Sequence, residues 1–382
     1  MALFRNTLFF SFTGILLLPA QVFPADDVEQ YLDELRRAEE EYGAYDQSLA
    51  DSYLGLGSAY EANRELDEAE DAYLRGMHVQ RVNNGLFDPG QIVYLEELAE
   101  LEVGRDNWLE GAEHLTRAHA ITTRNHPADS APVLKSASEL IDLHLQAHAL
   151  GVEDWNVHLS RADFLNQQQI RNGGWGNDDL NFTQERLQRT AYINYEIYKL
   201  SQQQVMYESR APQDGFGQRG TGPSLLAFFG KGKYALEQNV VLLRDANAEP
   251  ELVAEGMAQL GDWYSLFDKV NSAKSYYNQA FDIYAGSKGE EAATLLFSEP
   301  VQIPTFGIPG PESQATKRFR YNLDVSASGQ TKHIRLLTDK EGHSIRDLRR
   351  ASSIVRSVRF RPVLTKDGPA AKLDSALTVL LE

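Results

Sequence analysis

The sequence predicts an α-helical repeat solenoid followed by a small α+β domain with the element order β-β-α-β-β. Three observations predict this fold class. Small and aromatic residues recur at fixed offsets in three helical segments, apolar and polar residues alternate near the C-terminus, and the charge changes sign between the two parts. The chain carries 37 Lys and Arg against 55 Asp and Glu, whereas residues 301–382 carry 14 against 8. An acidic body joined to a basic end predicts two modules with different partners.

The N-terminus predicts export. Arg5 precedes an apolar run from Leu8 to Leu18, and small residues follow, which is typical of a secretory signal peptide over residues 1–25. Cleavage after Ala25, cleavage after Ala20 and retention as a membrane anchor are the alternatives. The chain has no cysteine, which excludes disulfides, thiol nucleophiles and cysteine-based zinc sites. We expect a protein of the periplasm of a Gram-negative bacterium.

Three repeats are clear, at about 50–83, 92–125 and 254–287. The first has large, Leu, Gly and Tyr positions on one predicted helix and small and aromatic positions on the next: Tyr53, Leu56, Gly57, Tyr60, Ala69, Tyr73 and Gly76. Weaker copies lie between the second and the last, around Leu140 and Leu159 and over 190–204 and 234–244. The pattern resembles the tetratricopeptide repeat (TPR) family over residues 27–286, and this implies stacked helical hairpins that bury a continuous core.

The TPR resemblance also implies a partner-binding groove. In that family the groove is lined by positions 2, 5, 9 and 12 of the first helix of each repeat. Six of the twelve such positions in the clear repeats are acidic and none is basic: Asp51, Glu61, Glu96, Glu100, Glu255 and Asp262. We therefore predict a groove for a basic or amine-rich partner. The alternative is that these acids only keep the helices soluble.

The C-terminal part has a different pattern. Prolines mark a linker over 287–312, and the domain that follows spans 313–382. Alternation over 319–325 and at Ile334 and Leu336, with a turn at Ser328-Gly329, predicts a hairpin. We expect a helix capped by Ser344, a third strand over 358–363, and a fourth strand over 373–381 after a tight turn at Asp367-Gly368.

This order, with the motif Arg359-Phe360-Arg361-Pro362 followed by Asp367-Gly368, resembles the C-terminal domain of TonB-type energy transducers over residues 301–382. The resemblance implies the fold and a binding role, with partners that add a strand to the sheet. An energy transducer has an uncleaved inner-membrane anchor and a long proline-rich span. This chain has a predicted signal peptide and a solenoid in their place, so we do not expect force transduction.

Motifs for chemistry are weak. Gly215-x-Gly217-x-x-Gly220 matches the dinucleotide fingerprint but lies between helices, without a preceding strand. His144 and His148 have helical i, i+4 spacing but no evident third metal ligand. The loop Asn177-Asp178-Asp179 lacks the spacing of a calcium-binding loop. We predict no enzyme activity, no catalytic residue, no cofactor and no metal.

The sequence thus predicts an exported interaction scaffold that holds two partners of the cell envelope. Envelope proteins or basic peptides are the expected partners of the groove, and nucleic acid is not expected. An anionic envelope polymer is an expected partner of the basic domain, whose helix carries Arg346, Arg349, Arg350 and Arg356. The basic domain could also dock into the acidic groove of its own chain or of a second copy. Two alternatives remain: an accessory of TonB-type outer-membrane transport, and an envelope enzyme with a site in the 172–223 loops.

Overall fold

The computed structural model describes residues 26–152, 155–173, 180–208, 225–304, 317–339 and 343–381. The predicted signal peptide, the Gly215-x-Gly217-x-x-Gly220 pattern and Asn177-Asp178-Asp179 lie outside these residues, as does most of the loop sequence proposed for an enzyme site. The chain forms two compact units, 1–174 and 175–382, and the division falls inside the predicted solenoid. Among the described helices, none combines the length and the apolar character needed to cross a membrane.

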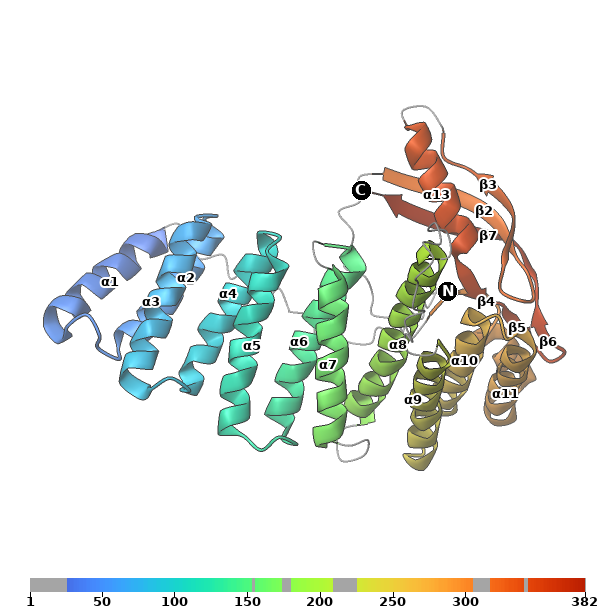
Figure 1. The fold of residues 1–382 in the computed structure, drawn as a ribbon, viewed down its shortest axis with the longest axis horizontal. Coiled ribbons are helices and arrows are strands. Elements are labelled where there is room, and N and C mark those ends of the chain that lie inside the picture. Colours follow the sequence, from blue (N-terminus) through green and yellow to red (C-terminus); the bar gives the residue numbers. More distant parts are fainter. Residues whose placement is uncertain are drawn as a thin grey trace, which may run out of the picture. The chain divides into compact units, whose positions relative to one another are not determined.

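Unit 1 is built from helical hairpins (Figure 1). Helix α2 packs against α3, α4 against α5, and α6 against α7, while α1 packs on α2. These pairs confirm the helices predicted for the first two repeats and for the weaker copy around Leu140 and Leu159. The bounds are α1 (Asp26–Tyr42), α2 (Leu49–Ala62), α3 (Leu66–Asn84), a 3-10 turn (Pro89–Gln91), α4 (Ile92–Gly104), α5 (Trp108–Asn125), α6 (Ala131–Leu150) and α7 (Trp155–Gly173).

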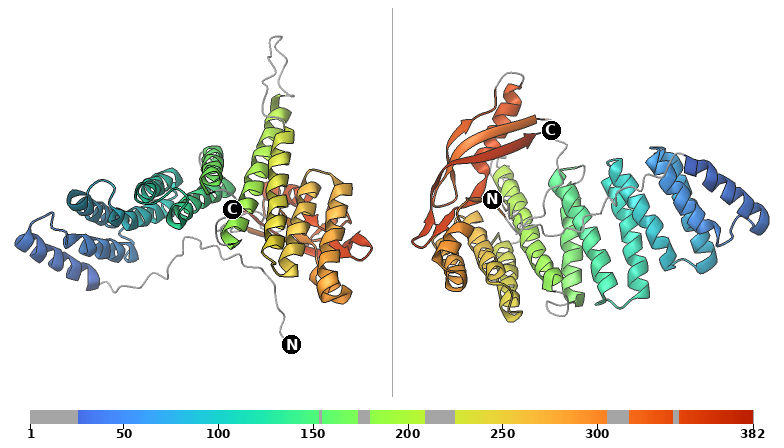
Figure 2. Two further views of the ribbon diagram at one scale, coloured as in Figure 1. Left: turned by 90° about the horizontal axis from the view of Figure 1, so that it is seen from below. Right: turned by 180° about the vertical axis from the view of Figure 1, so that it is seen from behind.

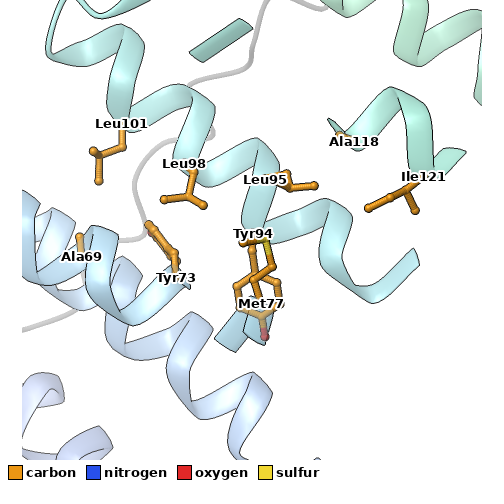
Figure 3. Packing of buried hydrophobic residues seen from close by; sticks show 9 residues of the cluster. All are labelled: Ala69, Tyr73, Met77, Tyr94, Leu95, Leu98, Leu101, Ala118 and Ile121. Atoms are coloured by element: carbon orange, nitrogen blue, oxygen red, sulfur yellow. The ribbon is translucent and has the colours of Figure 1, made fainter. Parts of the chain in front are cut away.

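The small repeat residues allow the close packing that was expected of them. A Cβ on Gly57 would collide with the ring of Tyr73, and a Cβ on Gly76 would collide with the ring of Tyr94. Side chains from α3, α4 and α5 point toward one another in the space between these helices and form a buried cluster (Figure 3). Its members are Ala69, Tyr73, Met77, Tyr94, Leu95, Leu98, Leu101, Ala118 and Ile121. Each hairpin thus buries its apolar face against the next one.

Unit 2 begins with two further hairpins and a short helix. These are α8 (Leu180–Glu208) with α9 (Leu225–Asp245), α10 (Pro250–Leu266) with α11 (Val270–Lys288), and α12 (Glu290–Leu296). In the last repeat, Gly261 lies under the ring of Tyr277 in the same way as Gly57 lies under Tyr73. The helix pair expected around 190–204 and 234–244 is therefore present as α8 and α9.

The C-terminal domain of unit 2 is an antiparallel sheet covered on one face by a helix (Figure 2). The strand order is β3-β2-β7, with β2 (Lys317–Val325), β3 (Thr331–Leu336) and β7 (Lys372–Leu381), and the helix is α13 (Ile345–Ser357). Phe319, Tyr321, Leu323 and Val325 are buried toward α13, as their alternation predicted. The Oγ of Ser344 accepts a hydrogen bond from the Asp347 N–H, which confirms the predicted helix cap.

The predicted linker and third strand differ from the structure. Residues 290–296 of the expected linker form α12, and β1 (Val301–Ile303) pairs antiparallel with β4 (Arg359–Arg361). Pro362 has no N–H to donate, and the expected strand over 358–363 ends there. Strand β5 (Val363–Thr365) follows and forms a hairpin with β6 (Gly368–Ala370). The turn expected at Asp367-Gly368 joins these two strands, with Gly368 at φ +109°.

Candidate functional site: an arginine clamp and an acidic patch

Arg361 of the C-terminal domain inserts between two carboxylates of the last repeat. Its Nη1 and Nη2 donate to the two oxygens of Glu255 at 2.6 and 2.7 Å, and its Nε and Nη2 donate to those of Asp262 at 3.0 and 2.6 Å. Arg361 is 3% exposed and Asp262 is fully buried. We call Arg361, Glu255 and Asp262 the arginine clamp. Paired, charge-assisted bonds of this kind are the strong class of hydrogen bond in proteins.

The elements fix this geometry from both sides. Glu255 and Asp262 are seven residues apart on α10, so two helical turns place them on one face. Arg361 ends β4, which is held by its pairing with β1 and by a hydrogen bond from the Phe360 N–H to the Gly329 carbonyl. The hydroxyl of Tyr277 donates to Asp262 Oδ1 at 3.0 Å, so the carboxylate has a partner on each side.

Burial and charge oppose each other in the clamp. Burial alone would lower the pKa of Arg361, but the carboxylates of Asp262 and Glu255 raise it well above its ordinary value. Burial and the charge of Asp262 likewise raise the pKa of the Tyr277 hydroxyl, which stays a neutral donor. The clamp is therefore a buried cation that is held by two carboxylates, one of which also accepts a hydrogen bond from a phenol.

The rest of the Arg359-Phe360-Arg361-Pro362 motif faces inward or toward the repeat. Phe360 is buried in the core of the C-terminal domain, and Pro362 is buried next to Arg361. Arg359 is bonded to Asp268 at 3.5 Å, but the Asp268 side chain is 76% exposed. In the hairpin that carries Asp367 and Gly368, β5 and β6 pack against α11. In this structure the motif thus contacts the chain's own last repeat.

Unit 1 carries a second acidic group, which we call the acidic patch: Glu61 of α2 with Glu96, Glu97 and Glu100 of α4. Burial raises the pKa of Glu100 to about 7, with further contributions from the charges of Glu97, Glu61 and Glu96. Burial, followed by the charges of Glu61 and Glu96, also raises the pKa of Glu97. After burial, the charges of the neighbouring glutamates thus disfavour the ionised forms of Glu97 and Glu100.

The structure distributes the six predicted groove residues among three places. Glu61, Glu96 and Glu100 meet in the acidic patch, and Glu255 and Asp262 meet in the arginine clamp. Asp51 is exposed in the first turn of α2, where its charge, after burial, helps to raise the pKa of Tyr94 to about 12. The Tyr73 hydroxyl donates to Glu61 Oε2 at 3.0 Å, so the tyrosine that corresponds to Tyr277 also bonds to a groove carboxylate, although Glu61 lies three positions later in its repeat than Asp262 does.

Sequence reasoning did not identify Glu97 or the two tyrosines as parts of these sites. Glu97 occupies a position outside the four that usually line the groove, although its spacing of three from Glu100 places it on the same helix face. Tyr73 and Tyr277 were assigned to packing alone. The equal spacing from Gly57 to Tyr73 and from Gly261 to Tyr277 was the available signal for their common role.

The histidines considered for a metal site have other partners. The Nδ1 atoms of His144 and His158 lie 2.8 Å apart, and His148 is tilted against Trp155 at 5.4 Å between ring centroids. Burial, followed by the charges of His158 and Arg161, lowers the pKa of His144 to about 3. The described part of the chain contains no cluster of three or more metal-ligating side chains.

Comparisons with known proteins give the following. No protein-family model matches the chain, and no curated protein matches it. Among solved structures, the TPR-like repeats of a Podosopora anserina protein assigned as a kinesin light chain align at 17% identity and a TM-score of 0.39, over 64% of this chain and 98% of that one. BtubC (BKLC) from P. vanneervenii aligns at 15% identity and a TM-score of 0.34, over 77% of this chain and 95% of that one.

Proposed function

We propose that the chain is an exported, non-enzymatic interaction scaffold of the bacterial periplasm, with a TPR-like acidic surface and a TonB-like domain that each bind an envelope partner. The single observation that carries the proposal is the arginine clamp. Two carboxylates at groove positions of the last repeat hold a buried arginine there. This pairing shows that carboxylates at groove positions can bind a guanidinium group, which is the chemistry that we propose for the acidic surface.

Three members of the acidic patch, Glu61, Glu96 and Glu100, occupy groove positions in the earlier repeats. Glu100 has the same place in its repeat as Asp262 has in the last one. Burial and the neighbouring carboxylates raise the pKa of Glu100 to about 7. A guanidinium or ammonium group placed there would reverse this repulsion. The carboxylates of the clamp already bind the chain's own Arg361, so a basic partner would bind at the acidic patch.

Arginine is the favoured side chain of such a partner. The guanidinium fork can bond two carboxylates at once, as Arg361 does, whereas an ammonium acts as a point charge. We expect the negative charge of the patch to speed the encounter with a basic partner and to make binding sensitive to salt, because the field has a range of about 8 Å at physiological ionic strength.

The test is a calorimetric titration of the mature chain with an arginine-rich peptide, its lysine counterpart and a glutamate-rich peptide. We expect the arginine peptide to bind most tightly and the glutamate peptide not to bind. The variant Glu96→Gln/Glu97→Gln/Glu100→Gln should weaken binding about tenfold or more, which corresponds to about 1.4 kcal/mol.

The matched control removes three exposed charges from α1: Glu29→Gln/Glu40→Gln/Glu41→Gln. This variant should bind the arginine peptide as the parent chain does. Equal weakening by the two variants would mean that the overall negative field attracts the peptide, and would refute a localised patch. Recovery of the same envelope protein in crosslinks of the parent chain, but not of the patch variant, would extend the result to cells.

A further inference from the structure

The C-terminal domain has a docked end and a free end. At the docked end, the β2–β3 turn bonds to Phe360 through Gly329, and Arg361 enters the clamp. The free end lies at the other ends of the same strands, where β2 begins, β3 finishes and α13 starts. A salt bridge of 3.0 Å between Lys317 and Asp347 joins the start of β2 to the start of α13.

Apolar and basic side chains are exposed together at the free end. Leu337 is 58% exposed and Ile345 is 69% exposed, although the domain has a well-packed core. The Leu337 N–H donates to the Arg320 carbonyl at 2.8 Å, which ties the end of β3 to the basic start of β2. We call Arg318, Arg320, Leu337, Ile345 and Arg346 the tip.

The tip carries three positive side chains. Arg318 and Arg320 alternate with the buried Phe319, so they lie on the sheet face that α13 does not cover. Neither they nor Arg346 forms an ion pair with another described residue. Of the acids at this end that the structure describes, Asp347 is bonded to Lys317, and Asp339 follows Leu337 by two residues.

Arg346 also begins a basic face of α13, on the side of the sheet opposite Arg318 and Arg320. Arg349, Arg350 and Arg356 follow Arg346 at offsets of three, four and ten residues, which places the four arginines on one helical face. All four are exposed, whereas Ala351 and Val355 on the other side of the helix are buried. The helix thus extends the positive field of the tip over about 15 Å, at 1.5 Å per residue.

We propose that the tip of the C-terminal domain binds an anionic lipid surface. Leu337 and Ile345 enter the boundary between head groups and acyl chains, and the three tip arginines bond to lipid phosphates. The combination of side chains favours lipid over a soluble polyanion, since a polyanion would use the arginines but would leave both apolar side chains in water. The inference goes beyond the proposed function and does not depend on the acidic patch.

The experiment is co-sedimentation of the full mature chain with vesicles of phosphatidylcholine alone and of phosphatidylcholine with phosphatidylglycerol. We expect binding to the anionic vesicles only, and weaker binding as the salt concentration rises. Arg320→Gln/Arg346→Gln should weaken binding about 25-fold, at about fivefold for each charge lost near the surface. Arg37→Gln/Arg244→Gln, which removes two exposed arginines elsewhere, should leave binding unchanged.

A second variant distinguishes lipid from polyanion. Leu337→Ser/Ile345→Ser should weaken vesicle binding about tenfold or more while leaving the affinity for inorganic polyphosphate unchanged. Both side chains are exposed, so the fold should tolerate the change, and circular dichroism checks this. Vesicle binding that is unaffected by this variant would overturn the lipid assignment in favour of a soluble polyanion. Equal binding to both kinds of vesicle, or binding to neither, would also overturn it.

Discussion

Arg361→Met removes the cation of the arginine clamp while keeping a long apolar side chain at the site. Asp262 then lies fully buried with Tyr277 as its donor, and the Glu255 side chain, 27% exposed, keeps some access to water. Breaking a buried ion pair by removing one partner costs about 3–5 kcal/mol, because the remaining charge stays buried. The partial exposure of Glu255 places our expectation near about 3 kcal/mol.

The assay is thermal and urea unfolding of the mature chain, followed by a probe in unit 2. A loss of about 3 kcal/mol corresponds to a fall in the melting temperature of about 6–12 °C for a unit of this size. The matched control is Arg359→Met on the same strand, since its ion-pair partner Asp268 is largely exposed at 3.5 Å. We expect this control to lose under about 1 kcal/mol.

A compensated variant checks the cause. Adding Glu255→Gln and Asp262→Asn to Arg361→Met removes the two charges that the guanidinium neutralised and keeps an acceptor for Tyr277, so a substantial part of the lost stability should return. The reasoning is refuted if Arg361→Met loses no more stability than Arg359→Met, or if neutralising both carboxylates restores nothing.

Three further predictions concern unit 1. The pKa of Glu100 is raised to about 7, so its contribution to stability is present below the unfolded pKa and is lost as pH rises through 7; urea unfolding should show Glu100→Gln gaining about 1 kcal/mol over the parent chain at pH 8 and little at pH 5. Gly57→Ala should cost about 1–3 kcal/mol because its Cβ would collide with a buried tyrosine ring, whereas Gly104→Ala, in open space within a helix, should be neutral or stabilising in the same measurement. Because the pKa of His144 is lowered to about 3, its contribution to the free energy of unfolding is present above pH 6.5 and is lost as pH falls below that value, by about 2 kcal/mol at pH 5. A free energy of unfolding that does not change with pH in either the parent chain or His144→Asn/His158→Asn would contradict this.

Local patterns predicted the local structure. Ser344 predicted the start of α13 because its hydroxyl can accept a hydrogen bond from an N–H of the first helical turn. Gly329 predicted the β2–β3 turn, where it has φ +76°. The Gly57 and Tyr73 spacing identified a helical hairpin, because close approach needs a residue without a side chain. These features depend on neighbours within a few tens of residues, so one sequence contains the information that they need.

Long-range pairings could not be assigned in the same way. Arg361 bonds to residues 99 and 106 positions earlier in the chain, and a sequence with many acids offers many such partners. The docking of a basic domain on acidic repeats was one of several alternatives, and charge alone could not select the residues. Strand β1 could not be predicted from its proline-rich segment, because it forms only by pairing with β4 of the C-terminal domain.

Strand β7 has a mechanical consequence. It runs from Lys372, opposite Val325 at the docked end, to Leu381, opposite Lys317 at the free end, with one register shift between Leu323 and Val325. Tension applied at the C-terminus would travel along this one strand to β6 and from there to the hairpin that rests on α11. The load would be resisted by the contacts of the last repeat, which include the bonds of the buried Arg361 to Glu255 and Asp262.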